Sequence, residues 1–174
     1  MIGSGPNRKA HDEPRYVTAS TPLGWMLMAA TDRGVCALVL GDDVESIEAE
    51  LRADFPGAKL AQFDDTLQRW TSVVVEYLNG GAPLPDLPLD VHASDFRLRV
   101  WNALKAIPAG EKRTYSEVAA AIGAPGSARA VAGACASNRI ALLIPCHRVV
   151  RSDGGLSGFR WGIERKARLL DMER

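Results

Sequence analysis

The chain has 174 residues, 47% of them hydrophobic and 24% charged, which is typical of a globular protein with one or two small domains. No apolar run approaches the roughly 18 residues of a membrane span, and the start lacks the apolar core of a signal peptide, so we expect a cytoplasmic protein. Cys36, Cys135 and Cys146 are far apart and, with only three histidines, predict no zinc cluster. We therefore expect reduced thiols and no metal or cofactor.

The formal net charge of zero conceals an uneven distribution of charge. Residues 1–92 contain 7 Lys and Arg against 14 Asp and Glu, whereas residues 93–174 contain 14 against 7. A basic half joined to an acidic half favours a polyanionic partner for the second half alone. Dispersed surface charge is the alternative interpretation.

The first half of the chain predicts a small α/β domain. Residues 1–14 are rich in Gly, Pro and charge, and we expect them to form a flexible tail. Strand-forming runs between residues 16 and 40, separated by turn sequences, predict an antiparallel sheet. Apolar residues at helical spacing then predict helices from Asp43 to about Phe55 and from Asp65 to Asn79.

Residues 82–91 include three prolines and indicate a linker or an extended strap. We place the domain boundary near residue 92, so that the predicted domains are residues 15–92 and 93–174.

Beyond this boundary the pattern is helical. Ser94 can cap one helix, and Thr114 with Glu117 makes a capping box for a second, short helix. Ser127 opens a third helix of small residues, and the last two helices predict a helix-turn-helix. Many core helix pairs share this pattern, so it is the basic charge around Arg129 that favours nucleic acid.

A thiol and an imidazole stand side by side at Cys146 and His147, between two apolar runs. Pro145 fixes its own φ and stiffens the backbone before the thiol. Successive side chains of an extended chain point to opposite faces, so we expect a turn or a bridging water to connect the two groups. The alternative is a structural cysteine beside a core histidine, and a packing role is what we expect for Cys36 and Cys135.

Several motifs in order give the second half a specific resemblance. They are Tyr115, the helix at Arg129, Asn138, the run from Pro145 to Val149, and the run from Gly155 to Gly162. Together they resemble the O6-alkylguanine-DNA alkyltransferases, above all the C-terminal half of the bacterial adaptive-response methyltransferases. The likeness extends from about Phe96 to Glu173, while the first half agrees only in size and pattern.

The resemblance implies an α+β protein with two domains. The first would be a ribonuclease-H-like α/β domain of structural role, and the second a helical, winged-helix-like domain that binds double-stranded DNA through its helix-turn-helix. It implies a DNA repair methyltransferase that moves the alkyl group of O6-alkylguanine, and of O4-alkylthymine, irreversibly to Cys146 after base flipping. We expect a monomer, and leave open whether it loads cooperatively on DNA.

The resemblance also implies roles for individual residues. The expected reaction network consists of Cys146, His147, Glu173 and Asn138. The expected DNA-binding residues are Arg129, which would insert into the base stack, with Tyr115, Ser116, Ala128 and Ala130. The expected lesion pocket consists of Tyr115, Pro145, Val149, Phe159, Arg160 and Trp161. The last three residues are bulky and depart from the family pattern, so they bear on the size of the alkyl group that the pocket tolerates.

Each of these residues also has a structural interpretation. Tyr115 could fill a gap between helices, Arg129 could be a solvated helix residue, and Glu173 could be a surface charge. At the level of function the alternatives are a non-repairing protein that binds alkylated DNA, a helix-turn-helix alkylation sensor, and a cysteine hydrolase. The cysteine disfavours the first, and the lack of an oxyanion motif disfavours the last.

Overall fold

The computed structural model describes Ile2 and residues 13–174, so most of the expected tail lies outside the described residues. The chain divides into two compact units. Of the described residues, the sheet unit contains 13–92 and Arg139–Leu143. The helical unit contains Ile2, Ala93–Asn138 and Ile144–Arg174.

The sheet unit is built on four strands in the order β3-β2-β1-β4. Its elements in chain order are β1 (Arg15–Thr21), β2 (Gly24–Thr31), β3 (Gly34–Gly41), α1 (Val44–Asp54), β4 (Lys59–Leu60) and α2 (Asp65–Leu78). The first three strands are antiparallel, and β4 adds to β1 in parallel over two residues. The predicted antiparallel sheet and both predicted helices are therefore confirmed.

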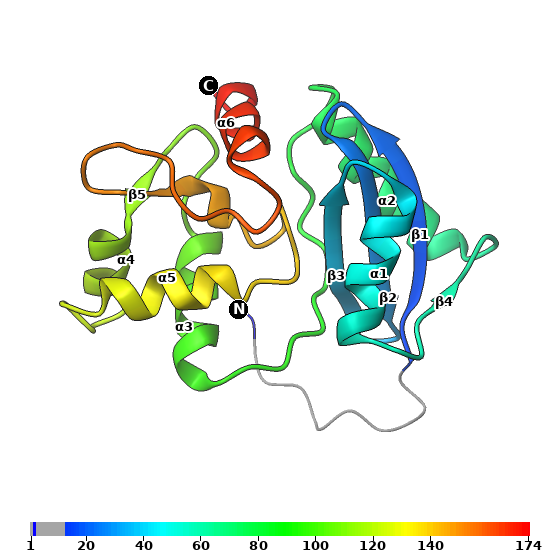
Figure 1. Cartoon of the computed structure of the whole chain (residues 1–174), viewed down its shortest axis with the longest axis horizontal. Helices are drawn as coiled ribbons and strands as arrows, with labels where there is room; N and C mark the ends of the chain where they lie inside the picture. Colours follow the sequence, from blue (N-terminus) through cyan, green and yellow to red (C-terminus); the bar gives the residue numbers. More distant parts are fainter. Residues whose placement is uncertain (1, 3–12) are drawn as a thin grey trace. The chain divides into compact units, whose positions relative to one another are not determined.

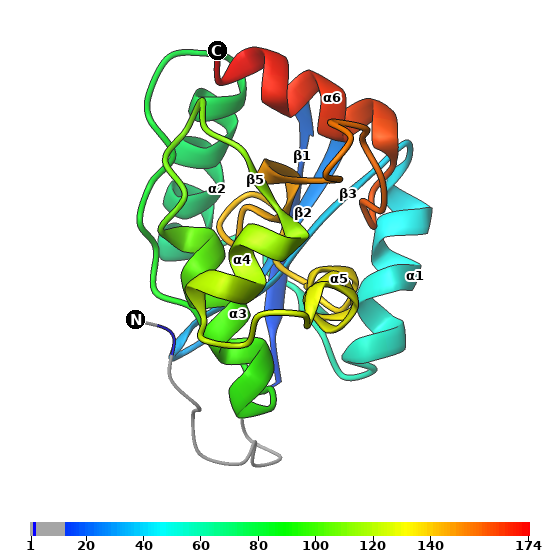
Figure 2. The same cartoon turned by 90° about the vertical axis from the view of Figure 1, so that its left-hand side faces the viewer.

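The two helices of this unit cover opposite faces of the sheet (Figures 1 and 2). The Tyr16 hydroxyl donates to Glu48 of α1, whereas Thr71 of α2 approaches the Met28 sulfur at 3.7 Å. Tyr16 pairs with Ala29, the neighbour of Met28, and neighbours on a strand point to opposite faces. This explains why β2 is buried continuously from Met26 to Thr31 rather than at alternate residues.

The segment 82–91 is an extended strap rather than a free linker. Val35 at the start of β3 donates to Pro88 O and accepts from Asp90 N, both at 2.8 Å. A side chain at Gly34 would place its Cβ 2.4 Å from Pro88 O, so the strap can approach only because this residue is glycine. The buried Asp90 also accepts from the Thr31 hydroxyl at 2.6 Å.

The helical unit contains four helices among its described residues, with two very short strands. Its elements are α3 (Asp95–Lys105), β5 (Arg113–Thr114), α4 (Tyr115–Ala121), α5 (Ala128–Ala136), the 3-10 turn η1 (Cys146–Arg148), β6 (Val149–Val150) and α6 (Ile163–Met172). α3 packs against α4 and α5, and Trp101 of α3 donates to Ala134 O of α5 at 2.9 Å. The Thr114–Glu117 capping box is present at the start of α4.

The short segment Arg139–Leu143 belongs to the sheet unit, although the sequence analysis counts it with the second domain. Leu38 of β3 donates to Arg139 O at 2.9 Å and accepts from Ala141 N at 3.0 Å. The Arg139 side chain pairs with Asp54 at 3.0 Å. These contacts join residues about 100 positions apart, which local sequence patterns do not indicate.

At the level of class, the prediction of a mixed α+β fold is confirmed. Neither α6 nor the parallel β5–β6 pair was predicted from the sequence pattern. Half of the residues of α6 are charged, so its apolar face is narrow. None of the helices in the described part of the chain combines the length and hydrophobicity that a membrane span requires.

Asp64 should be the residue on which the start of α2 depends. Its carboxylate accepts from Leu67 N at 2.9 Å, a bond that holds the pKa of Asp64 below its usual value. Asp64→Ala should lower the free energy of unfolding by about 1 kcal/mol in urea titrations. Since the folded pKa is depressed, this contribution should be lost as the pH falls through it. The exposed neighbour Asp65 is the control, and a loss for Asp65→Ala as large as that for Asp64→Ala would contradict the capping argument.

Candidate active site

Cys146 lies at the start of η1 and is 5% exposed. Pro145 precedes it with φ −81°, and the Cys146 N–H donates to Ile144 O at 2.8 Å. The tight turn replaces the extended backbone that would point Cys146 and His147 to opposite faces. The thiol is therefore held on a rigid, buried turn.

The Asn138 amide is the nearest hydrogen-bond donor to the thiol. Its Nδ2 donates to Cys146 Sγ at 3.3 Å and to Ile144 O at 3.0 Å, and the side chain is fully buried. Asn138 follows the C-cap of α5, Ser137, and does not adopt a left-handed conformation. A donor aimed at sulfur favours the thiolate over the thiol.

His147 and Glu173 meet although 26 positions separate them in the chain. The His147 Nε2 lies 3.0 Å from Glu173 Oε1, and both side chains are almost completely buried. The other ring nitrogen, Nδ1, is buried and makes no hydrogen bond in the described structure. One nitrogen is therefore fixed by the carboxylate and the other retains its capacity to bond.

Burial sets the protonation of both reactive groups. It raises the pKa of the Cys146 thiol, while the Asn138 donor and the charge of Lys166 act in the opposite direction. It lowers the pKa of His147, against the attraction of Glu173. At neutral pH these shifts favour an uncharged thiol and an uncharged imidazole. The thiol must therefore lose its proton before its sulfur can act as a nucleophile.

Lys166 is a site residue that the sequence analysis missed. Its side chain is completely buried, and Nζ donates to Val149 O at 2.5 Å and to Ser157 O at 3.0 Å. Burial lowers the pKa of Lys166, while the nearby thiols act to raise it. A possible signal was its place three residues before the buried Leu169 on α6, although lysines on amphipathic helices usually reach solvent.

Tyr115, the first residue of α4, contacts Ser157, which also accepts from Lys166. Its half-buried hydroxyl donates to Ser157 O at 3.2 Å, so this carbonyl accepts from both Tyr115 and Lys166. Burial raises the pKa of Tyr115, which keeps the phenol protonated. The adjoining Gly158 has φ +55° and leaves space beside the Tyr115 hydroxyl, where a Cβ would come within 3.9 Å.

The expected rim residues occupy different environments. The Phe159 ring meets the His147 ring edge-on at a centroid distance of 6.5 Å and the Trp161 ring at 5.3 Å. Phe159 and Trp161 are buried, whereas Arg160 between them is exposed. Phe159 therefore packs against the imidazole and Trp161 packs against Phe159. Pro145 and Val149, on either side of the Cys146–Arg148 turn, are buried.

The expected DNA-binding residues gather at two helix starts. Arg129 and Ala130 are exposed and Ala128 half-exposed on the first turn of α5, and Ser116 is exposed on the first turn of α4. Val131, Ala134 and Cys135 form the buried side of α5. The small residues of α5 thus leave a slim surface with one long cationic side chain, Arg129.

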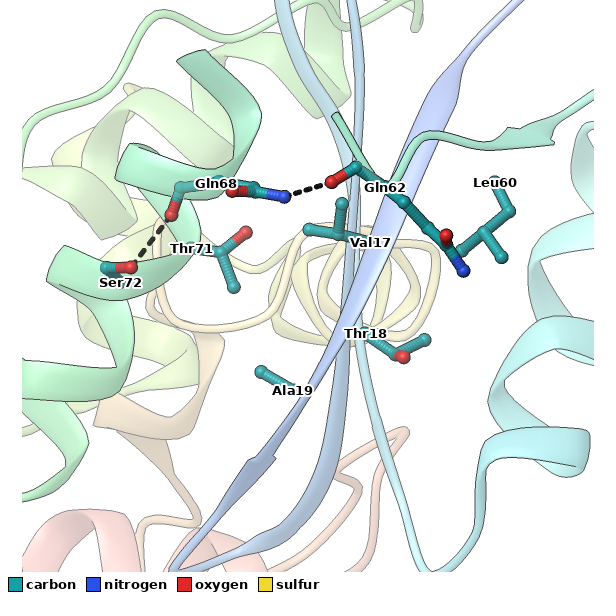
Figure 3. A pocket seen from close by; sticks show the side chains of 8 residues that line it. All are labelled: Val17, Thr18, Ala19, Leu60, Gln62, Gln68, Thr71 and Ser72. Carbon is teal, nitrogen blue, oxygen red and sulfur yellow. Dashed lines mark hydrogen bonds between the residues drawn. The ribbon is translucent and has the colours of Figure 1, made fainter. Parts of the chain in front are cut away.

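A separate hollow of about 470 Å³ lies in the sheet unit (Figure 3). It is lined by Val17, Thr18, Ala19, Leu60, Gln62, Gln68, Thr71 and Ser72. The hydroxyls of Thr71 and Ser72 donate to carbonyls of their own helix, and Gln68 donates to Gln62 O. None of the residues that line it is acidic, basic, His or Cys, so its Ser and Thr hydroxyls have no adjacent general base among the lining residues.

Comparison with known proteins gives consistent relatives. Residues 95–174 match the family model described as 6-O-methylguanine DNA methyltransferase, DNA binding domain. The chain is 48% identical over 159 residues to the bifunctional transcriptional activator/DNA repair enzyme Ada of Escherichia coli, covering 91% of this chain and 45% of that protein. It thus spans about half the length of that relative.

Other relatives are matched over nearly their whole length. A methylated-DNA–protein-cysteine methyltransferase of Mycolicibacterium paratuberculosis is 36% identical over 91% of this chain and 92% of its own. The solved structure of Mycobacterium tuberculosis OGT in complex with DNA is similar with a TM-score of 0.77 and 34% identity, covering 91% of this chain and 92% of that one.

Lys166 should favour the Cys146 thiolate through its charge. Lys166→Met should slow carbamidomethylation of Cys146 by iodoacetamide at neutral pH by roughly 3- to 10-fold, because loss of a nearby cation raises the thiol pKa further. Site-resolved peptide masses would give the rate. Lys112, an exposed lysine of the same unit, provides the control variant Lys112→Met. An unchanged rate for Lys166→Met would limit Lys166 to its carbonyl contacts.

Proposed function

The chain belongs to the methylated-DNA–protein-cysteine methyltransferase family, and we propose that it repairs alkylated DNA by direct reversal. The proposed reaction moves the alkyl group of O6-alkylguanine, and of O4-alkylthymine, from duplex DNA to Cys146. The observation that carries the proposal is the buried Cys146 sulfur, 3.3 Å from the Asn138 amide, on the same short turn as His147, whose ring contacts Glu173. No cofactor enters the reaction.

The proposed chemistry follows from these side chains. An sp³ alkyl carbon calls for a strong nucleophile, and His147, oriented by Glu173, is the group placed to take the thiol proton through a bridging water. Sulfur then forms a bond to the alkyl carbon as the bond from carbon to O6 breaks, and guanine leaves with a proton. The thioether product is not readily hydrolysed, so each molecule acts once.

Tyr115, Lys166 and the loop at Ser157 form the proposed pocket for the extruded base. The protonated Tyr115 hydroxyl and the Lys166 ammonium both point to Ser157 O, and either can donate to a base that replaces this contact. The small Gly158 leaves room beside the hydroxyl. In this proposal Phe159 and Trp161 support His147 rather than touch the alkyl group.

The proposed DNA surface is the helix-turn-helix of α4 and α5, within a winged-helix-like second domain, residues 93–174. The predominance of basic residues in that half supports a polyanionic partner. Arg129 is proposed to fill the gap left by the flipped base. Residues 15–92 are proposed to form a ribonuclease-H-like domain of structural role, and the protein to act as a monomer.

The alternatives remain less well supported. A protein that binds alkylated DNA without repair has no need of a reactive cysteine, whereas here a buried thiol accepts from the Asn138 amide and is followed in the chain by His147, which contacts Glu173. An alkylation sensor would use the same thiol without a flipped base. The experiments below distinguish these functions.

The stoichiometry of transfer should be one. Mixing the protein with duplex DNA containing O6-methylguanine should add about 14 Da, one methyl in place of one proton, at Cys146 and then stop, because the thioether has no release route. Intact mass and peptide mapping measure this. Cys146→Ser should abolish transfer and retain DNA binding. Repeated turnover, or methyl on another residue, would refute the proposal.

Arg129 should matter for duplex DNA but not for the chemistry. Extruding a base costs a few kcal/mol of lost stacking, which an inserted side chain offsets. Arg129→Ala should therefore slow single-turnover repair of duplex DNA far more than transfer from a free O6-alkylguanine base. Equal proportional losses on both substrates would place Arg129 in the pocket or the fold instead.

A further inference from the structure

Arg148 is the residue of the Cys146–His147–Arg148 turn to which the proposed chemistry assigns no task. Its Nε donates to Glu173 Oε2 at 2.9 Å and its Nη2 to Glu173 Oε1 at 2.7 Å, a two-bond fork. Its Nη1 donates to Ile107 O at 2.6 Å. The Arg148 side chain is 6% exposed and the Glu173 side chain 2%, so the pair is nearly removed from water.

The fork fixes the state of the carboxylate. A guanidinium is always charged, and the planar two-bond geometry suits an ionised carboxylate. An ionised carboxylate can only accept hydrogen bonds. Glu173 Oε1 therefore accepts from both Arg148 and His147, which requires a proton on His147 Nε2.

This requirement determines which His147 nitrogen can act as a base. A neutral imidazole with its proton on Nε2 has its lone pair on Nδ1. Nδ1 is the nitrogen that is buried without a hydrogen bond in the described structure. A doubly protonated ring would have no lone pair on either nitrogen.

The charge on His147 depends on whether Arg148 or the His147 ring balances the negative charge of Glu173. Glu173 attracts a second proton to the ring, whereas the cations of Arg148 and Lys166 oppose it. The Cys146 thiol, which precedes His147 in the chain, is a fourth titratable neighbour. Without Arg148, the buried carboxylate would lose two hydrogen bonds from a cation and would keep its contact with the imidazole. That change favours an imidazolium, because a buried carboxylate stabilises a positive charge on a ring that it contacts.

We propose that Arg148 is a positioning residue that neutralises Glu173 and thereby holds His147 as the neutral imidazole protonated on Nε2, with Nδ1 as the proton acceptor. The proposal rests on the proposed function, since it concerns the proton path from Cys146. It differs from a purely structural role, in which Arg148 would only tie η1 to Glu173 and to Ile107 at the end of α3.

Nitrogen-15 NMR of the histidine rings in the full chain tests this. The chain has three histidines, and His147→Gln identifies the His147 signals. In the wild type we expect a neutral ring with the proton on Nε2 at pH 7. In Arg148→Gln we expect the His147 titration midpoint to rise by about one pH unit or more, while Arg148→Lys, which retains the charge, should stay near the wild type.

The matched control removes a different arginine, one that forms ion pairs with two carboxylates. Arg15 of the sheet unit pairs with Asp32 and Asp64, and Arg15→Gln should leave the His147 titration unchanged. Thermal unfolding, measured in parallel, reports structural damage. A loss of stability in Arg148→Gln with an unmoved His147 midpoint would overturn the proposal and leave Arg148 a structural residue.

The wild type alone also decides the question if Arg148→Gln does not fold. A wild-type His147 that is charged at pH 7, or that carries its proton on Nδ1, would refute the proposal. These measurements need no DNA and no alkyl donor. Failure of methyl transfer would therefore count against the proposed function, and failure of the NMR expectation against the role of Arg148.

Discussion

The arrangement of the reactive turn depends on one buried carboxylate. Glu173 accepts from Arg148 through both oxygens and from His147 through one, and so joins α6 to η1. A Cβ at Gly110 would approach Glu173 O to 2.9 Å, so the backbone around Glu173 is closely packed as well. A carboxylate held this firmly can orient an imidazole, which a carboxylate on a mobile side chain cannot do.

α6 contributes a cation as well as this anion. Lys166 and Glu173 are seven positions apart, close to two helical turns, and therefore project from one side of the helix. Lys166 reaches Val149 O and Glu173 reaches His147, so the two contacts secure η1 and the strand after it. The Lys166 cation lies near the Cys146 thiol, and the Glu173 anion contacts the His147 imidazole. A proton transfer from sulfur to nitrogen leaves a negative sulfur and a positive ring, and these two charges stabilise that product.

Local signals predicted most of the helices and the sheet, because caps such as Thr114 and turns act within a few residues. The Cys146–His147 pair was visible as a motif, whereas Glu173 was expected only through the family resemblance. Lys166 was missed, because its spacing from Leu169 is a weak signal and a lysine on an amphipathic helix usually reaches solvent rather than being completely buried. The inward packing of Phe159 and Trp161, and the pairing of Arg139 with β3, depend on contacts between distant segments that periodicity does not encode.

The two tasks proposed for the protein lie at opposite ends of one helix. Arg129 is on the first turn of α5, and Asn138, which donates to Cys146, follows its last turn. Nine positions of helix rise about 13 Å, several times the spacing of stacked bases. If Arg129 occupies the base stack as proposed, a base stacked beside it would lie far from the sulfur along the helix axis. On that proposal the separation of Arg129 from Asn138 along α5 is the physical reason for the base to leave the stack before transfer.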